Sequence, residues 1–142
     1  MFMRLLCFLF VLGVVADLSA EPVVLEIGAE VSETGGEDWT LPDGQLVQLR
    51  IIEKQFHLLF LDEDRLLIEP AVKKVILRGE EARNQTNNIN IVLKPGSDNT
   101  LTHVRKVYPP YDYWLMLLIP DPEKSGEWTS LQRRRFQPEV VE

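Results

Sequence analysis

The sequence contains few side chains that could combine into a reactive or metal-binding group. Its only histidines, His57 and His103, could join Met116 in a soft-metal site, because imidazole nitrogen and thioether sulfur are ligands that copper accepts. His57 and Met116 also fit packing roles, since both stand inside apolar runs. No spacing brings the three together. We therefore predict no metal and no cofactor, and keep these residues as weak metal-ligand candidates.

The acidic run at residues 62–64 (Asp-Glu-Asp) offers carboxylates for calcium. It lacks the glycine and the distant bidentate glutamate of a calcium loop. Short acidic side chains also bond their own backbone in tight turns. We expect a solvated turn here.

Catalysis requires a nucleophile beside a base, or paired carboxylates in a cleft. Downstream of residue 20 the sequence has no cysteine, no glycine-bracketed serine and no histidine-containing metal motif. Its carboxylates lie mostly in segments that read as loops and turns. We predict that the protein is not an enzyme.

Large aromatic side chains are the remaining candidates for binding. Exposed rings near loops bind sugars or proteins, whereas buried rings belong to a core, and the sequence leaves both roles open. The candidate interaction surface consists of Trp39, Tyr108, Tyr111, Trp114 and Trp128. Two further motifs are a glycosylation sequon at Asn84 and a basic run at residues 133–135, which could dock on an acidic partner or pair within the chain.

Two segments that alternate without a polar face must organise the fold. Residues 55–61 and 113–119 are apolar on both sides, so each predicts a strand covered on both faces. The acidic turn predicts a hairpin after the first of them. In the second, we expect Leu115 and Leu117 in the core and Trp114 and Met116 on the outer face, beneath the Trp39 loop, the Trp128 segment or a partner.

Other strands are predicted from period-two alternation between turn residues. A tight turn at residues 53–54 should join 45–52 to the first two-sided strand, and a polar loop is expected at 30–38. Residues 128–136 are ambiguous between an edge strand and a short helix, and we favour the strand. The remaining predicted strands are residues 23–27, a strand beginning near 75, 89–94 and 101–108.

Strands spaced about ten residues apart, with no helix-period segment, predict an all-β fold. We expect a single antiparallel β-sandwich over residues 21–142, with a closed barrel as the alternative. Residues 1–20 have the charge, apolar run and small terminal residues of a cleaved signal peptide, with cleavage after Ala20 or Ala16. We therefore predict an exported, periplasmic or secreted protein.

Charge and cysteine content narrow the class of partner. Residues 21–142 carry 21 acidic and 14 basic side chains, a net charge of −7, which opposes binding to nucleic acid or anionic membrane. The only cysteine, Cys7, lies in the predicted signal peptide, so no disulfide is expected. A small exported domain without disulfides is more typical of the bacterial periplasm.

The layout resembles immunoglobulin and fibronectin type III sandwiches. Its most specific feature is Pro110-Tyr111-Asp112-Tyr113, which is similar to a tyrosine corner, in which a tyrosine hydroxyl bonds backbone upstream. The FLDEDRLLIEP stretch also looks like a hairpin of small bacterial periplasmic domains, some of which are associated with metal efflux. Export, small size, the two-sided apolar strands and the absence of catalytic spacing predict a periplasmic accessory or assembly role through protein contacts. The alternative is a periplasmic module that binds carbohydrate or a metal ion.

Overall fold

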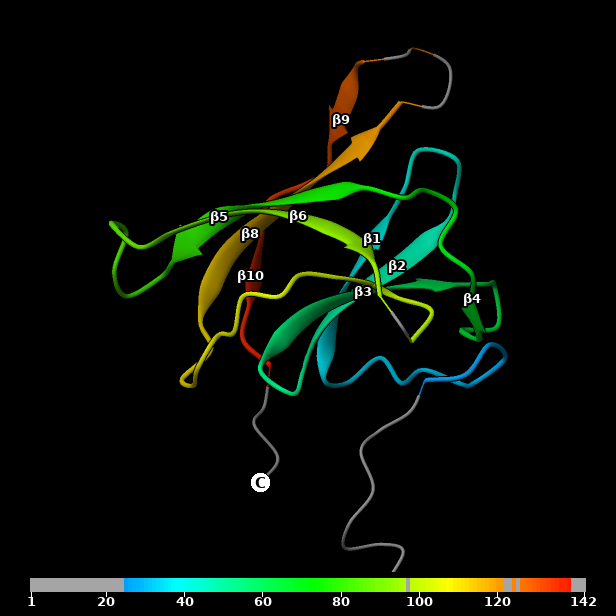
Figure 1. The fold of residues 1–142 in the computed structure, drawn as a ribbon, viewed down its shortest axis with the longest axis horizontal. Coiled ribbons are helices and arrows are strands. Elements are labelled where there is room, and N and C mark those ends of the chain that lie inside the picture. Colours follow the sequence, from blue (N-terminus) through cyan, green and yellow to red (C-terminus); the bar gives the residue numbers. More distant parts are fainter. Residues whose placement is uncertain (1–24, 97, 122–123, 125, 139–142) are drawn as a thin grey trace, which may run out of the picture.

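The protein is an antiparallel all-β fold in this computed structural model, which describes residues 25–96, 98–121, 124 and 126–138 (Figure 1). The predicted signal peptide lies outside this part of the chain. The described residues contain ten strands and no helix. The strands are β1 (Gly36–Thr40), β2 (Leu46–Ile52), β3 (Gln55–Leu61), β4 (Leu67–Ile68), β5 (Val75–Glu81), β6 (Asn88–Pro95), β7 (Leu101–Thr102), β8 (Tyr113–Pro120), β9 (Trp128–Ser130) and β10 (Arg134–Phe136).

The strands form one hydrogen-bonded path that curls into a half-barrel. Its order is β1-β2-β3-β7-β6-β5-β8-β10, with β4 added to β3 and β9 added to β8. Figure 1 shows β5, β6 and β8 on one side of the molecule and β1, β2 and β3 on the other. The short strand β7 joins the two sides, because it pairs with both β3 and β6. The all-β prediction is confirmed, whereas two separate sandwich sheets are not.

Side chains join the two end strands of this path. The Trp39 indole N–H of β1 donates to the carbonyl of Gln132, 2.7 Å away, and the Arg134 guanidinium of β10 lies 3.3 Å from the Glu37 carboxylate. These contacts hold β1 against β10 without a backbone ladder between them.

Tight turns set the register of β3. The two-residue turn at Glu53 and Lys54 has positive φ at both positions, the conformation that matches the twist of a hairpin. At the other end, the Asp62 carboxylate accepts the backbone N–H groups of Asp64 and Leu66, each at 2.9 Å. The predicted turns at 53–54 and 62–64 are therefore confirmed.

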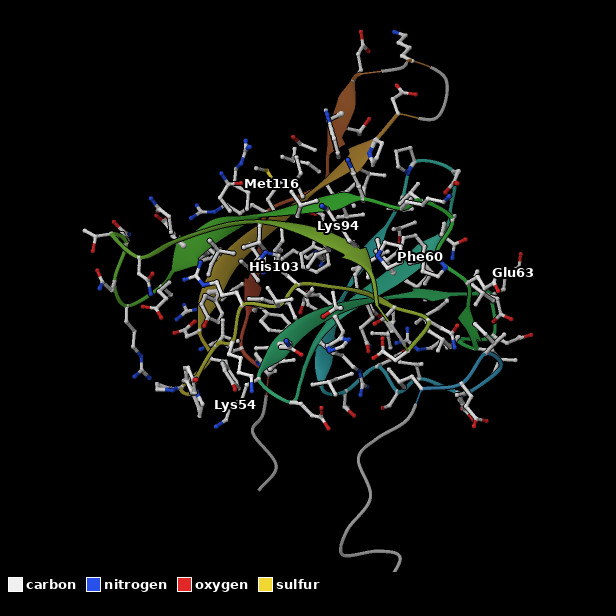
Figure 2. The ribbon with its side chains drawn as sticks, viewed as in Figure 1. Lys54, Phe60, Glu63, Lys94, His103 and Met116 are labelled. Atoms are coloured by element: carbon white, nitrogen blue, oxygen red, sulfur yellow. The ribbon has the colours of Figure 1, made fainter. Side chains whose placement is uncertain are left out.

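The main core lies between the two sides of the half-barrel. Phe56, Leu58 and Phe60 of β3 are fully buried there, as are Leu115 and Leu117 of β8. Figure 2 shows Met116, the residue between those two leucines, on the outer side of β8. The prediction that Leu115 and Leu117 lie in the core is thus confirmed.

The opposite face of β3 has its own cover. Leu59 and Leu61 pack with Val31 and with Leu67 of β4, and Leu25 lies against this second cluster. β3 also pairs with β2, β4 and β7. Both faces of β3 are therefore buried, as its apolar pattern predicted.

Three predicted segments differ from the structure. Residues 25–27 form no strand, and the rest of the predicted strand at 23–27 lies outside the described residues. The predicted loop at 30–38 ends earlier, because β1 begins at Gly36 and pairs with β2. The predicted strand at 101–108 contains only β7, after which the chain leaves the sheet. In the ambiguous C-terminal segment the strand prediction is confirmed, as β9 and β10.

Candidate functional site

Histidine 57 belongs to a buried polar cluster at the end of the β6–β7 turn. Its Nδ1 lies 2.8 Å from the Thr100 hydroxyl and 3.3 Å from the Asp98 carboxylate, and the Thr100 hydroxyl donates to Asp98 at 2.8 Å. Burial lowers the pKa of the imidazole, and the carboxylates of Asp98 and Glu53 oppose that shift. Thr100 is only 1% exposed, so this cluster fastens the turn to β3.

The candidate metal ligands lie in different environments. His57 is buried on β3, Met116 lies on the outer face of β8, and His103 follows β7, where its Nδ1 accepts the backbone N–H of Arg105 at 3.0 Å. Across the described residues, no three His, Cys, Asp or Glu side chains form a group that could hold a metal ion.

The five candidate aromatic residues do not form one surface. Trp39 is buried in the core, which corrects its placement among the binding candidates. Tyr108 and Trp128 are exposed, and the Lys54 ammonium lies 5.0 Å from the Tyr108 ring centroid. The Tyr111 hydroxyl donates to the carbonyl of Val107 at 3.4 Å, the upstream contact expected of a tyrosine corner.

Arginine side chains of the C-terminal segment cover Trp114. Of the three covers expected for this residue, the segment that begins at Trp128 is the one that supplies these contacts. The guanidinium carbons of Arg133 and Arg135 lie 5.1 and 5.7 Å from its ring centroid. Arg133 pairs with Glu80 at 2.7 Å and Arg135 with Asp112 at 2.9 Å, and the hydrogen bonds from Arg135 lower the pKa of that carboxyl. The basic run at 133–135 is therefore paired within the chain.

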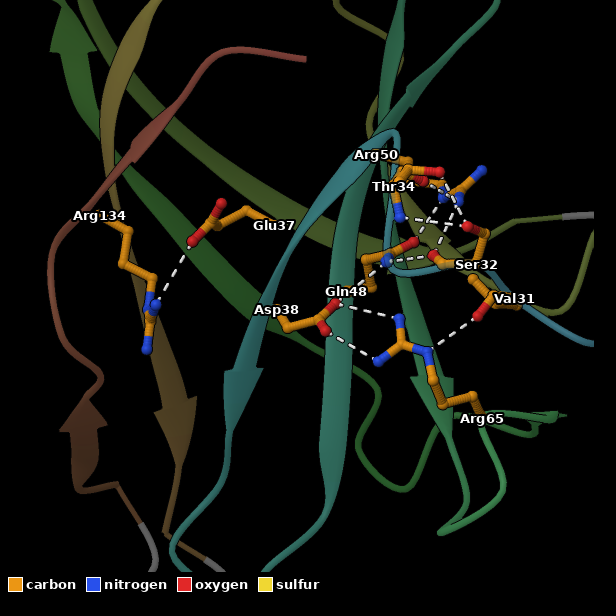
Figure 3. A network of polar contacts seen from close by, with 9 residues as sticks. All are labelled: Val31, Ser32, Thr34, Glu37, Asp38, Gln48, Arg50, Arg65 and Arg134. Atoms are coloured by element: carbon orange, nitrogen blue, oxygen red, sulfur yellow. Dashed lines mark hydrogen bonds and ion pairs between the residues drawn. The ribbon is translucent and has the colours of Figure 1, made fainter. Parts of the chain in front are cut away.

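A polar network on the outer face of β1 and β2 binds the preceding loop (Figure 3). The buried Gln48 amide donates to the Ser32 carbonyl at 2.8 Å and to Asp38 at 3.0 Å. Arg65 donates to Asp38 at 2.8 Å and to the carbonyl of Val31 at 2.9 Å. These mutual contacts give the network a structural role: it holds residues 31–38 against the sheet.

The outer face of β5, β6 and β8 carries an apolar strip. Ile76 of β5 stands opposite Val92 of β6 and opposite Leu118 of β8. Met116 lies two residues before Leu118, on the same face of β8. Ile76, Val92 and Met116 remain partly exposed. We call these four residues the outer strip. Unlike the outer face of β3, the outer strip has no second hydrophobic cluster over it among the described residues.

Cations border the outer strip. The exposed side chains that flank it include Lys74, which directly precedes β5, Arg78 of β5 and Lys94 of β6. Within the described chain, none of the three takes part in an ion pair. Sequence reasoning missed this site because each cation looked like an ordinary strand-surface residue.

Charge is divided unevenly along the chain, and this signal could have revealed the site. Residues 21–69 hold 12 acidic and 3 basic side chains, whereas residues 70–142 hold 9 and 11. The first range includes β1 to β4 and the second includes β5 to β10. The net charge of −7 thus conceals a slightly basic half.

A groove of about 670 Å³ adjoins the outer strip. One bank is β6, with Val92 and Lys94, and the other is the segment after β7, with His103 and Val104. Val104 is 84% exposed, the largest exposure among the large hydrophobic side chains of the described residues. Figure 2 labels Lys94 and His103 on the two banks.

Comparisons with protein-family models, curated proteins and solved structures find no match to this chain.

In the described part of the chain there is no helix long and apolar enough to span a membrane. Asn84, the sequon asparagine, is exposed in the loop between β5 and β6.

Proposed function

We propose that this chain is an exported, non-enzymatic binding domain that acts through protein contacts on the outer strip. The observation that carries the proposal is the contrast between the two outer faces. On β3 the outer face is covered by the chain itself, whereas the outer strip is apolar, partly exposed and bordered by cations that form no ion pair within the described part of the chain. Apolar patches with a polar rim are typical of protein interfaces.

The proposal includes export and a sandwich-like architecture. Export is supported by the signal-peptide pattern of residues 1–20. An immunoglobulin-like or fibronectin-like relationship is supported by the hydrogen bond from Tyr111 to the Val107 carbonyl. A binding role is favoured over catalysis because Thr100, the hydroxyl beside His57 and Asp98, is buried away from any substrate. An accessory or assembly role in the periplasm fits these features.

Site-specific photo-crosslinking in the producing organism tests the proposal. A photoreactive residue placed at Met116 should give one defined crosslinked protein, and the same residue at exposed Glu63, on the β3–β4 turn, should not. Adding Ile76→Asp should remove the Met116 crosslink while leaving the thermal unfolding midpoint nearly unchanged. Equal crosslinking from both positions, or a Met116 crosslink that survives Ile76→Asp, would overturn the proposal.

A further inference from the structure

Over most of the length of β6, no strand of the described residues pairs with one of its two sides. On its other side, β5 pairs with β6 at six consecutive positions. On this side, β7 pairs only with Lys94 and Pro95. After Thr102 the chain moves away, and the groove occupies the place where a longer neighbour would lie. β6 therefore lies between two strands of the sheet, but most of its β7-facing edge is unpaired among the described residues. We call this the open edge of β6.

The register identifies which backbone groups face this opening. The Gly96 N–H donates to the Thr100 carbonyl at 3.0 Å, so these two residues form a hydrogen-bonded pair. Such pairs alternate along an antiparallel ladder, so Lys94 also directs its N–H and C=O toward β7. By the same alternation, Asn90 and Val92 direct theirs into the groove. No strand of the described residues pairs with them there.

We propose that this open edge accepts an extended peptide strand whose side chains alternate between apolar and acidic. The inference rests on the proposed function, because the strand would belong to the partner that contacts the outer strip. Backbone groups of Asn90 and Val92 would supply the hydrogen bonds of strand addition. The groove volume of about 670 Å³ leaves room for the added strand.

The alternating apolar and acidic side chains of the peptide follow from the residues on the two sides of the groove. Side chains on one face of an added strand would meet Ile91 and the exposed Val104, which line the groove and are apolar. Those on the other face would lie near Lys94 and His103. The exposed Arg105 and Lys106 follow directly after the lining residue Val104 in the chain. Successive residues of a strand point to opposite faces, so one strand can satisfy both.

Charge complementarity favours a peptide with acidic side chains over one with basic side chains. Lys94, Arg105 and Lys106 are exposed, and among the described residues they form no ion pair. Opposed charges steer association and discriminate between partners. A basic strand would meet the like charge of Lys94 in the groove, and those of Arg105 and Lys106 just beyond Val104.

Binding of blocked, labelled heptapeptides to the purified exported protein tests this inference by fluorescence anisotropy. A peptide of alternating valine and glutamate should bind at least tenfold more tightly than one of alternating valine and lysine, and raising the salt concentration should narrow that difference. Two further peptides carry N-methyl groups on the odd-numbered or on the even-numbered amides of the valine–glutamate sequence. One of these two peptides should bind about tenfold more weakly than the unmethylated peptide, because its methyl groups replace the N–H groups that face β6. Equal affinity for the two charge patterns, or no effect of either set of methyl groups, would overturn the inference.

Two variants place the binding on β6. Val92→Pro removes an N–H that faces the groove and leaves the β5 ladder donors in place, whereas Val92→Thr retains the N–H and the side-chain shape. The proline variant should bind the valine–glutamate peptide at least tenfold more weakly than the threonine variant. If Val92→Pro does not fold, hydrogen exchange of the unaltered protein decides instead, since the peptide should slow exchange at Asn90 and Val92. Unchanged exchange there would refute the edge as the site.

The two proposals fail separately. A Met116 crosslink without peptide binding would leave the outer strip as an interface and exclude strand addition. If the peptide binds and slows hydrogen exchange on β6, but Met116 gives no crosslink, the open edge of β6 is supported as a binding site and the outer strip is excluded as an interface. A protein that self-associates at low salt and then ignores the peptide would mean that a second copy, through its acidic half, occupies the groove, and would also overturn the inference.

Discussion

Burial of both faces of β3 predicts that truncating either face destabilises the protein severely. Phe60 and Leu59 are adjacent, are both fully buried, and belong to different hydrophobic clusters. Replacing a buried phenylalanine with alanine costs about 3–5 kcal/mol, and a buried leucine about 2–5 kcal/mol, because lost contacts add to the cavity left behind. A strand exposed on one face would show a large cost for only one of the two.

Equilibrium unfolding in urea measures these costs. With a denaturant dependence of about 2 kcal/mol/M, Phe60→Ala should lower the midpoint by about 1.5–2.5 M, and Leu59→Ala by about 1–2.5 M. Glu63→Ala in the neighbouring exposed turn is the matched control and should change the free energy of unfolding by less than about 0.5 kcal/mol. If Leu59→Ala behaves like Glu63→Ala, the second cluster does not cover β3 and the reasoning fails.

Further predictions concern titration and close packing. Burial lowers the pKa of His57, so the unfolded chain binds more protons than the folded chain below about pH 6.5, and the free energy of unfolding should fall as the pH drops through that value. Urea unfolding between pH 7 and pH 5 should show this loss in His103→Gln but not in His57→Gln. A Cβ at Gly79 would lie 1.9 Å from the Trp114 carbonyl oxygen, so Gly79→Ala should lower the thermal midpoint sharply. The same change at Gly28, where a Cβ would meet nothing within 4 Å, should cost only the modest strain of its positive φ.

Alternation of apolar residues predicted the interior of this protein well. It identified Leu115 and Leu117 as inward residues of β8, and it predicted β3 and β6 as strands, because apolar residues recurring at a period of two are typical of a strand. Turn chemistry predicted the reversals at 53–54 and 62–64 for an equally local reason. Both signals act over a few residues, so a single sequence reveals them.

Long-range pairing was harder to predict. Residues 23–27 alternate like a strand, yet Leu25 packs on the second cluster without joining the sheet. Trp39 looked available for binding, but its indole N–H reaches the carbonyl of Gln132, 93 residues away. β7 ends at Thr102, after which the chain no longer pairs with β6. The alternation of residues 101–108 does not predict that end. Such outcomes depend on which segments meet, which local pattern does not encode.

β3 and β8 have nearly the same apolar pattern, and their different surroundings carry the functional argument. Leu117 of β8 is fully buried, whereas Met116 beside it is partly exposed on the outer strip. In the isolated protein, Leu117→Ala should therefore cost about 2–5 kcal/mol and Met116→Ala much less. A partner that covers the outer strip would reverse the order for binding, because interface energy concentrates in apolar side chains that become buried only in the complex. If Met116→Ala instead destabilised the free chain as much as Leu117→Ala, the chain itself would already cover the outer strip, and no partner would be needed to explain the second apolar face of β8.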